Sequence, residues 1–129
     1  MALKVSTAIR KSGIFVVAPI GSIDAAGQTI FQEKVNSVLN QNPDVVIFDM
    51  EFADYINSMG IRVLVKAKKA MKQRGGKIMF INLQPQIKKV FDILNALPSL
   101  KVFANMQELD DYLDAMQTRS HSNQDEDGQ

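Results

Sequence analysis

The chain has 129 residues, a formal net charge of +1, a hydrophobic fraction of 46%, one histidine and no cysteine. These totals predict one globular domain and exclude disulfide scaffolds and thiolate metal sites. No apolar run approaches the roughly 20 residues that cross a bilayer, and the first residues lack signal-peptide features. We therefore expect a cytoplasmic protein that has no membrane partner.

The hydrophobic periodicity predicts strands that alternate with helices. The chain is expected to open with a hairpin of strands over 3–9 and 14–18, followed by a helix ending at 39 and a buried strand over 44–49. A helix then starts at 58 and ends before the glycines at 75 and 76, and a strand follows over 77–81. The last expected elements are a helix over 85–94, a strand over 101–103 and a helix ending at 116. Such alternation implies βαβ units, so we predict an α/β fold: one domain with a mixed, mostly parallel sheet of about five strands and four helices.

Capping and breaking residues set the expected ends of several elements. The segment 19–21, with its proline and glycine, is expected to end the second strand of the hairpin. Ser22 or Asp24 can cap the first helix, and Asn105 with Glu108 forms the pattern of a capping box for the last one. These signals place the helices between the strands as the α/β pattern requires.

The domain is expected to cover residues 1–116. Residues 117–129 are acidic and show no apolar periodicity, so they predict a disordered tail. His121, the only histidine, lies in this tail and is interpreted as a solvated side chain.

Enzyme signatures are missing. The sequence contains no Gly-rich phosphate loop, no GxSxG and no HExxH, and His121 is wrongly placed for a Ser-His-Asp arrangement. Asp24, Asp49, Glu51 and Asp54 could serve as an acid–base pair or a Mg²⁺ site, but a helix cap and loop acids explain them better. We therefore expect no enzyme, no cofactor and no metal.

Nucleic-acid binding is not expected either. The bases concentrate in one helix, and the sequence lacks the broad basic face with interleaved aromatic residues that single-stranded nucleic acids require. A locally basic helix instead suits a protein partner.

The segment 57–60 lies where a loop turns into the helix that starts at 58. Free backbone N–H groups and the positive end of the helix dipole favour negative charge at such a place. The hydroxyl of Ser58 is accessible there and can carry a phosphate. We predict that Ser58 is a modified switch residue and not a catalytic nucleophile.

The same helix predicts a docking surface. Projection at 100° per residue places an apolar arc toward the sheet and leaves Ile61 and Val65 outside it, on the side of Ser58. Arg62, Lys66 and Lys69 border this aliphatic pair, which is the composition of a partner-binding surface. The alternative is that Ile61 and Val65 pack on a neighbouring helix and the basic side chains only solvate a face.

Several short motifs follow one another in a fixed order. They are Gly21-Ser22-Ile23-Asp24, Asp49-Met50-Glu51-Phe52, Asn57-Ser58-Met59-Gly60-Ile61, Gly75-Gly76-Lys77, and the stretch from Pro85 to Leu94. Their order and spacing resemble the STAS domain of bacterial anti-sigma-factor antagonists, over nearly the whole folded part of the chain.

The resemblance implies roles for individual residues. In that family a serine in the loop before the second helix is phosphorylated, which implies Ser58 as the phosphoacceptor and Gly60 as a close-approach glycine. Asp24 matches a loop aspartate near the phosphosite. Asn57 and Met59 depart from the usual Asp-Ser-Ser/Thr-Gly and remove a charge and a hydroxyl beside the acceptor.

The resemblance also implies a function. The unphosphorylated protein would bind a GHKL-type serine kinase that is also the anti-sigma factor, and a PP2C-type serine phosphatase would reset the cycle. The alternative is a non-phosphorylated STAS module that senses a small ligand or nucleotide, or that serves as a subunit of a transport or stressosome-like assembly.

Overall fold

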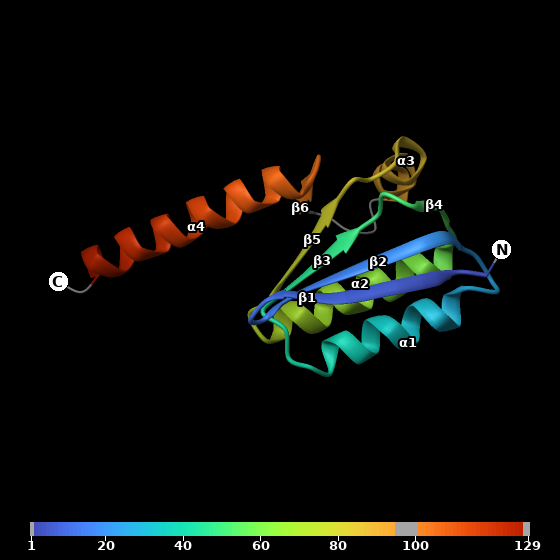
Figure 1. The fold of residues 1–129 in the computed structure, drawn as a ribbon, viewed down its shortest axis with the longest axis horizontal. Coiled ribbons are helices and arrows are strands. Elements are labelled where there is room, and N and C mark those ends of the chain that lie inside the picture. Colours follow the sequence, from blue (N-terminus) through green and yellow to red (C-terminus); the bar gives the residue numbers. More distant parts are fainter. Residues whose placement is uncertain (1, 95–100, 128–129) are drawn as a thin grey trace.

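A mixed six-stranded sheet forms the centre of the protein in a computed structural model that describes residues 2–94 and 101–127 (Figure 1). The elements are β1 (Lys4–Lys11), β2 (Ile14–Ile23), α1 (Gln28–Leu39), β3 (Val45–Asp49), β4 (Ala53–Ile56), α2 (Ser58–Gln73), β5 (Lys77–Ile81), α3 (Pro85–Leu94), β6 (Lys101–Phe103) and α4 (Met106–Asp127). The strand order is β1-β2-β3-β5-β6, with β4 beside the end of β2. Only β1 is antiparallel to its neighbour, which confirms the predicted α/β class and its opening hairpin.

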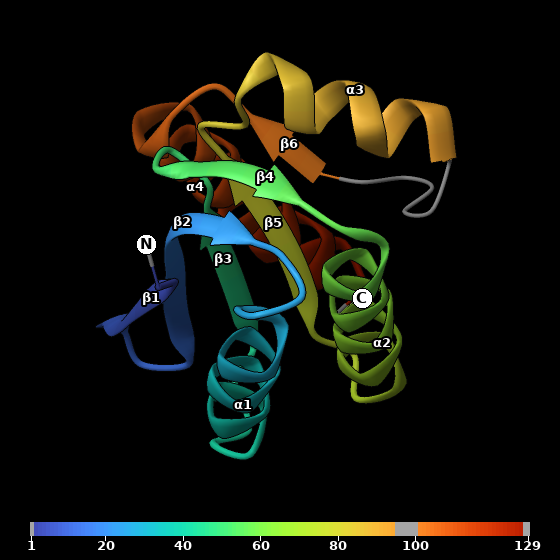
Figure 2. The ribbon, with the colours of Figure 1, turned by 90° about the vertical axis from the view of Figure 1, so that its right-hand side faces the viewer.

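Helices cover both faces of the sheet. Helices α1 and α2 lie on one face and α4 on the other, as Figures 1 and 2 show together. Strand β3 divides its side chains accordingly: Val46 and Phe48 belong to the core cluster of α1 and α2, whereas Val45 and Ile47 belong to the cluster that contains Leu109 of α4. The predicted burial of this strand on both faces is confirmed.

Strand β2 is longer than the sequence predicted. It continues through Pro19 and Gly21 to Ile23, because its two halves pair with different neighbours. The ladder with β3 ends at Val17, so the missing N–H of Pro19 falls where β2 is paired with β1 alone. Gly21, with a φ of +112°, begins the ladder with β4.

Strand β4 was expected as a loop, and it brings the strand count to six. Its four residues are too few for a clear hydrophobic period, and its partner Gly21–Ile23 lies about thirty positions earlier in the chain. The pairing is therefore a tertiary effect without a local sequence signal.

Two predicted helix boundaries were wrong. Helix α1 begins at Gln28 after Gly27, without a side-chain cap; Asp24 instead accepts hydrogen bonds from the N–H groups of Ala26 and Gly27, at 3.1 and 3.0 Å, in the preceding turn. Helix α4 begins as predicted, because the Asn105 side chain accepts from the Glu108 N–H at 2.9 Å. Its backbone then continues as helix to Asp127, through most of the expected tail, and no proline or glycine interrupts 106–127.

An ion pair joins α4 to the opening hairpin. The guanidinium of Arg10 in β1 donates two hydrogen bonds to the carboxylate of Asp110 in α4. Hydrogen bonding by Arg10 lowers the pKa of Asp110 below its ordinary value. The two side chains are 31% and 30% exposed, so the pair is expected to contribute about 0.2–1 kcal/mol to stability.

Asp110→Asn is therefore expected to lower the free energy of unfolding by about 0.2–1 kcal/mol near neutral pH. Because the folded-state pKa of Asp110 is lowered, its contribution is present above the unfolded-state pKa and is lost as the pH falls through the folded-state pKa. The free energies of unfolding of the wild type and Asp110→Asn should therefore become equal in acid, which urea unfolding between about pH 7 and pH 3 measures. Asp114→Asn, at an exposed position one turn later, is the matched control. If the stability difference between the wild type and Asp110→Asn stayed as large in acid as at neutral pH, the stabilising role of the ion pair would be contradicted.

Candidate functional site

Ser58 is the first residue of α2 and is exposed. The preceding residue, Asn57, has an extended backbone and caps the helix: its side-chain oxygen accepts a hydrogen bond from the N–H of Gly60 at 2.8 Å. The hydroxyl of Ser58 has no hydrogen-bond partner among the described residues. The structure thus places this hydroxyl in solvent at the start of a helix, as the sequence predicted.

The ends of β2 and β4 position this junction. Ile23 pairs with Ile56 in parallel register, so Asp24 and Asn57 each follow a paired residue at the same edge of the sheet. The backbone N–H of Asn57 donates to the carbonyl of Ile23 at 2.9 Å. The loop that carries Asp24 therefore lies beside the start of α2, as the resemblance implied.

Gly60 lets α2 approach the sheet closely. A Cβ atom at this position would lie 2.7 Å from Cγ2 of Ile23 and 2.8 Å from Cγ1 of Ile56, both on buried side chains. Real Cβ contacts are not this short, so the glycine is required by packing. This position matches the predicted close-approach glycine.

Gly60→Ala is expected to lower the free energy of unfolding by about 1–3 kcal/mol, the usual cost of overpacking a core. Alanine has the better helix propensity, by about 1 kcal/mol, so a net loss would show that the contact with Ile23 and Ile56 dominates. Chemical denaturation measures the change. Ser58→Ala, two positions earlier and exposed, serves as control; a Gly60→Ala protein as stable as the wild type would disprove the close approach.

The predicted docking surface is only partly present. Arg62, Val65, Lys66 and Lys69 are exposed, Val65 to 36%. Ile61 is only 5% exposed and belongs to the core cluster that also contains Ile56 of β4 and Ile87 of α3. For Ile61 the structure thus supports the alternative that the sequence left open, packing rather than docking, and β4, which was not expected, contributes to the same cluster.

Three apolar side chains that the prediction did not include are also exposed in the segment 52–59. Phe52 is 60%, Tyr55 50% and Met59 40% exposed. Sequence reasoning assigned Phe52 and Tyr55 to a loop, and no periodic signal marked them as exposed. We refer to these three side chains and Val65 together as the apolar rim: Phe52, Tyr55, Met59 and Val65.

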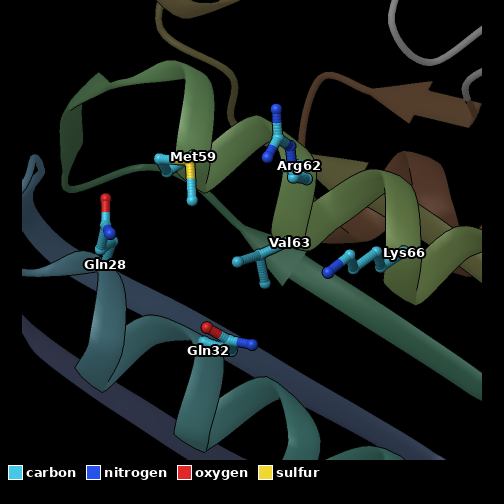
Figure 3. A pocket seen from close by; sticks show the side chains of 6 residues that line it. All are labelled: Gln28, Gln32, Met59, Arg62, Val63 and Lys66. Atoms are coloured by element: carbon cyan, nitrogen blue, oxygen red, sulfur yellow. The ribbon is translucent and has the colours of Figure 1, made fainter.

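A small hollow lies between α1 and α2 (Figure 3). It is lined by Gln28, Gln32, Met59, Arg62, Val63 and Lys66. Its volume is about 40 Å³, whereas sites for drug-sized ligands and cofactors usually measure about 300–1,000 Å³. The place next to Ser58 therefore suits contact with another surface better than enclosure of a nucleotide.

The acidic side chains near the site take part in local structure. Asp49 accepts a hydrogen bond from the Asn82 amide at 3.0 Å, and Asp54 accepts one from the Ser22 hydroxyl at 2.8 Å. Asp24 holds the turn before α1. In the part of the chain that the structure describes, no group of three or more acidic, histidine or cysteine side chains gathers as a metal site would require.

These features define a small α/β domain that presents a helix start and an exposed apolar rim to its surroundings, with a hollow of about 40 Å³ beside Met59 and a second of about 180 Å³ further along α1 and α2. The model of the STAS domain family matches residues 6–109, and the chain belongs to this family. No helix in the described ranges has the length and apolar character needed to cross a membrane.

Several known proteins resemble this chain in sequence or in fold. BtrV of Bordetella bronchiseptica, named as an anti-sigma factor antagonist, is 26% identical over 96 residues, which cover 74% of this chain and 82% of BtrV. A Thermotoga maritima structure with the same type of name has a TM-score of 0.76 at 16% identity, over 84% of this chain and 92% of its own. The phosphorylated form of SpoIIAA, a Bacillus cell fate determinant, has a TM-score of 0.68 at 17% identity, over 85% and 99%.

Proposed function

We propose that this protein is a phosphorylation-switched antagonist of an anti-sigma factor, and that Ser58 carries the phosphate. The observation that carries the proposal is the exposed hydroxyl of Ser58 at the start of α2, a helix that also exposes Met59, Val65 and the basic side chains of Arg62, Lys66 and Lys69. A relative named as an anti-sigma factor antagonist, and a structural neighbour known in a phosphorylated form, support it. The unphosphorylated protein binds a GHKL-type serine kinase, which is also the anti-sigma factor.

The kinase supplies the chemistry in this scheme. The Ser58 oxygen attacks the γ-phosphorus of ATP, the new O–P bond forms as the bond to the ADP oxygen breaks, and the hydroxyl proton passes to a base of the kinase. A PP2C-type serine phosphatase hydrolyses the phosphoserine back to serine and inorganic phosphate. The chain itself is a cytoplasmic binding protein without enzyme activity or cofactor.

The phosphate acts through local electrostatics. It adds about −1.5 to −2 charges and three acceptor oxygens to Ser58. At a helix N-terminus this charge stabilises the domain by about 0.3–1 kcal/mol. In an interface it repels the acidic groups that Arg62, Lys66 and Lys69 attract and brings bound water into the contact. The fold therefore persists while binding fails.

Incubation of the purified protein with its cognate kinase and ATP tests the proposal. Intact-mass analysis is expected to show one added phosphate, none on Ser58→Ala, and its removal by the phosphatase. Ser58→Ala is a suitable control because the side chain is exposed and has no hydrogen-bond partner among the described residues. An unmodified wild-type protein, or a phosphate on another residue, would refute the switch and favour a non-phosphorylated STAS module.

A further inference from the structure

We propose that Arg62 binds the phosphate of phosphorylated Ser58, so that modification also withdraws this guanidinium from the partner-binding surface. The inference depends on the proposed function for the presence of a phosphate on Ser58. It adds the residue of this chain that responds to that phosphate.

The spacing on α2 brings the two side chains together. Arg62 follows Ser58 by four positions on the same helix, and both are exposed. Residues at this spacing are neighbours on a helix surface, with Cβ atoms about 5–6 Å apart, and an acidic group one turn before a basic one is the favourable order. The planar guanidinium can donate two parallel hydrogen bonds to phosphate oxygens.

The charges around Ser58 leave Arg62 available for this contact. Arg62 has no ion-pair partner among the described residues, and the first turn of α2 contains no acidic residue. The N-cap is the neutral Asn57, and the carboxylate of Asp24 accepts hydrogen bonds from its own turn. A phosphate on Ser58 would thus be the first negative charge within the first turn of α2, four residues before the unpaired Arg62.

The position of the Arg62 side chain is compatible with this role. Arg62 lines the hollow together with Met59 and Val63, and in Figure 3 its side chain extends from α2 away from Gln28 and Gln32 of α1. Lys66 is a further turn along α2, about 12 Å of helix rise from Ser58, and is too distant for the same contact. It is therefore a matched control: a second exposed cation on the same helix.

Direct incorporation of phosphoserine at position 58 during translation tests the contact without a kinase. A ³¹P NMR titration of the full chain measures the pKa of the phosphate. The pKa is expected to be lower in the wild type than in Arg62→Gln, because Arg62 favours the dianion, and Lys66→Gln is expected to match the wild type. The increase in thermal midpoint on phosphorylation should likewise shrink in Arg62→Gln.

Two results would overturn the inference: a phosphate pKa that Arg62→Gln leaves unchanged, or one that Lys66→Gln raises as much as Arg62→Gln does. These results are independent of the kinase experiment. A kinase that does not modify Ser58 refutes the proposed function but leaves the titration interpretable. A kinase that modifies Ser58 normally, combined with an unchanged titration, refutes the role of Arg62 alone.

Discussion

Ser58→Asp is expected to abolish binding to the kinase partner while the thermal midpoint stays close to that of the wild type. The exposed position at the start of α2 tolerates a carboxylate, because the helix dipole favours negative charge there. In the complex the same charge is desolvated against a partner selected by Arg62, Lys66 and Lys69. Disruption of such an interface costs about 2–5 kcal/mol, which corresponds to about 30-fold to several-thousand-fold in Kd.

Isothermal titration calorimetry with the cognate kinase measures this loss, and circular dichroism melting measures the stability. Ser58→Ala is the matched control and is expected to bind as the wild type does, because the hydroxyl has no partner among the described residues. A Ser58→Asp protein that binds with wild-type affinity would contradict the electrostatic mechanism. A Ser58→Asp protein that unfolds would contradict the exposed position of the side chain.

Ile61→Ala is expected to lower the free energy of unfolding by about 2–5 kcal/mol, the range for truncation of a buried aliphatic side chain. Ile61 is 5% exposed within the cluster that contains Ile56 and Ile87, so the change leaves a cavity between α2 and its neighbours. Urea unfolding monitored by circular dichroism measures the effect. The loss would identify Ile61 as a core residue and so decide between the two alternatives that the helical projection left open for it.

Val65→Ala is the matched comparison on the same helix. Val65 is 36% exposed, so its truncation is expected to change stability by less than about 0.5 kcal/mol. It removes apolar contact area from the apolar rim, and binding to the kinase should weaken. If Val65→Ala destabilised the fold as much as Ile61→Ala, the division of α2 into a buried and an exposed aliphatic position would be wrong.

Elements defined by local patterns were predictable from the sequence. Strand β3 and helix α2 occur as expected, because a β-branched run, an apolar arc at helical spacing and a paired glycine stop are short-range signals. The same signals located Ser58, the central residue of the candidate site.

Features that depend on contacts distant in the sequence were not predictable. Strand β4 exists because it pairs with the second half of β2, and it lies in the environment that buries Ile61. The exposure of Phe52 and Tyr55 depends on the same strand. Of the two interpretations of Ile61, the one that placed it on the docking surface was therefore wrong, whereas the exposed position of Ser58 at the start of α2 was predicted correctly.

The hollow between α1 and α2 has a practical consequence for chemical inhibition. A drug-sized molecule binds by burying most of its surface in a pocket of about 300–1,000 Å³, and the space beside Met59 is about 40 Å³. Competitive inhibitors of this surface should therefore be peptides or small designed proteins that spread over Phe52, Tyr55 and Val65.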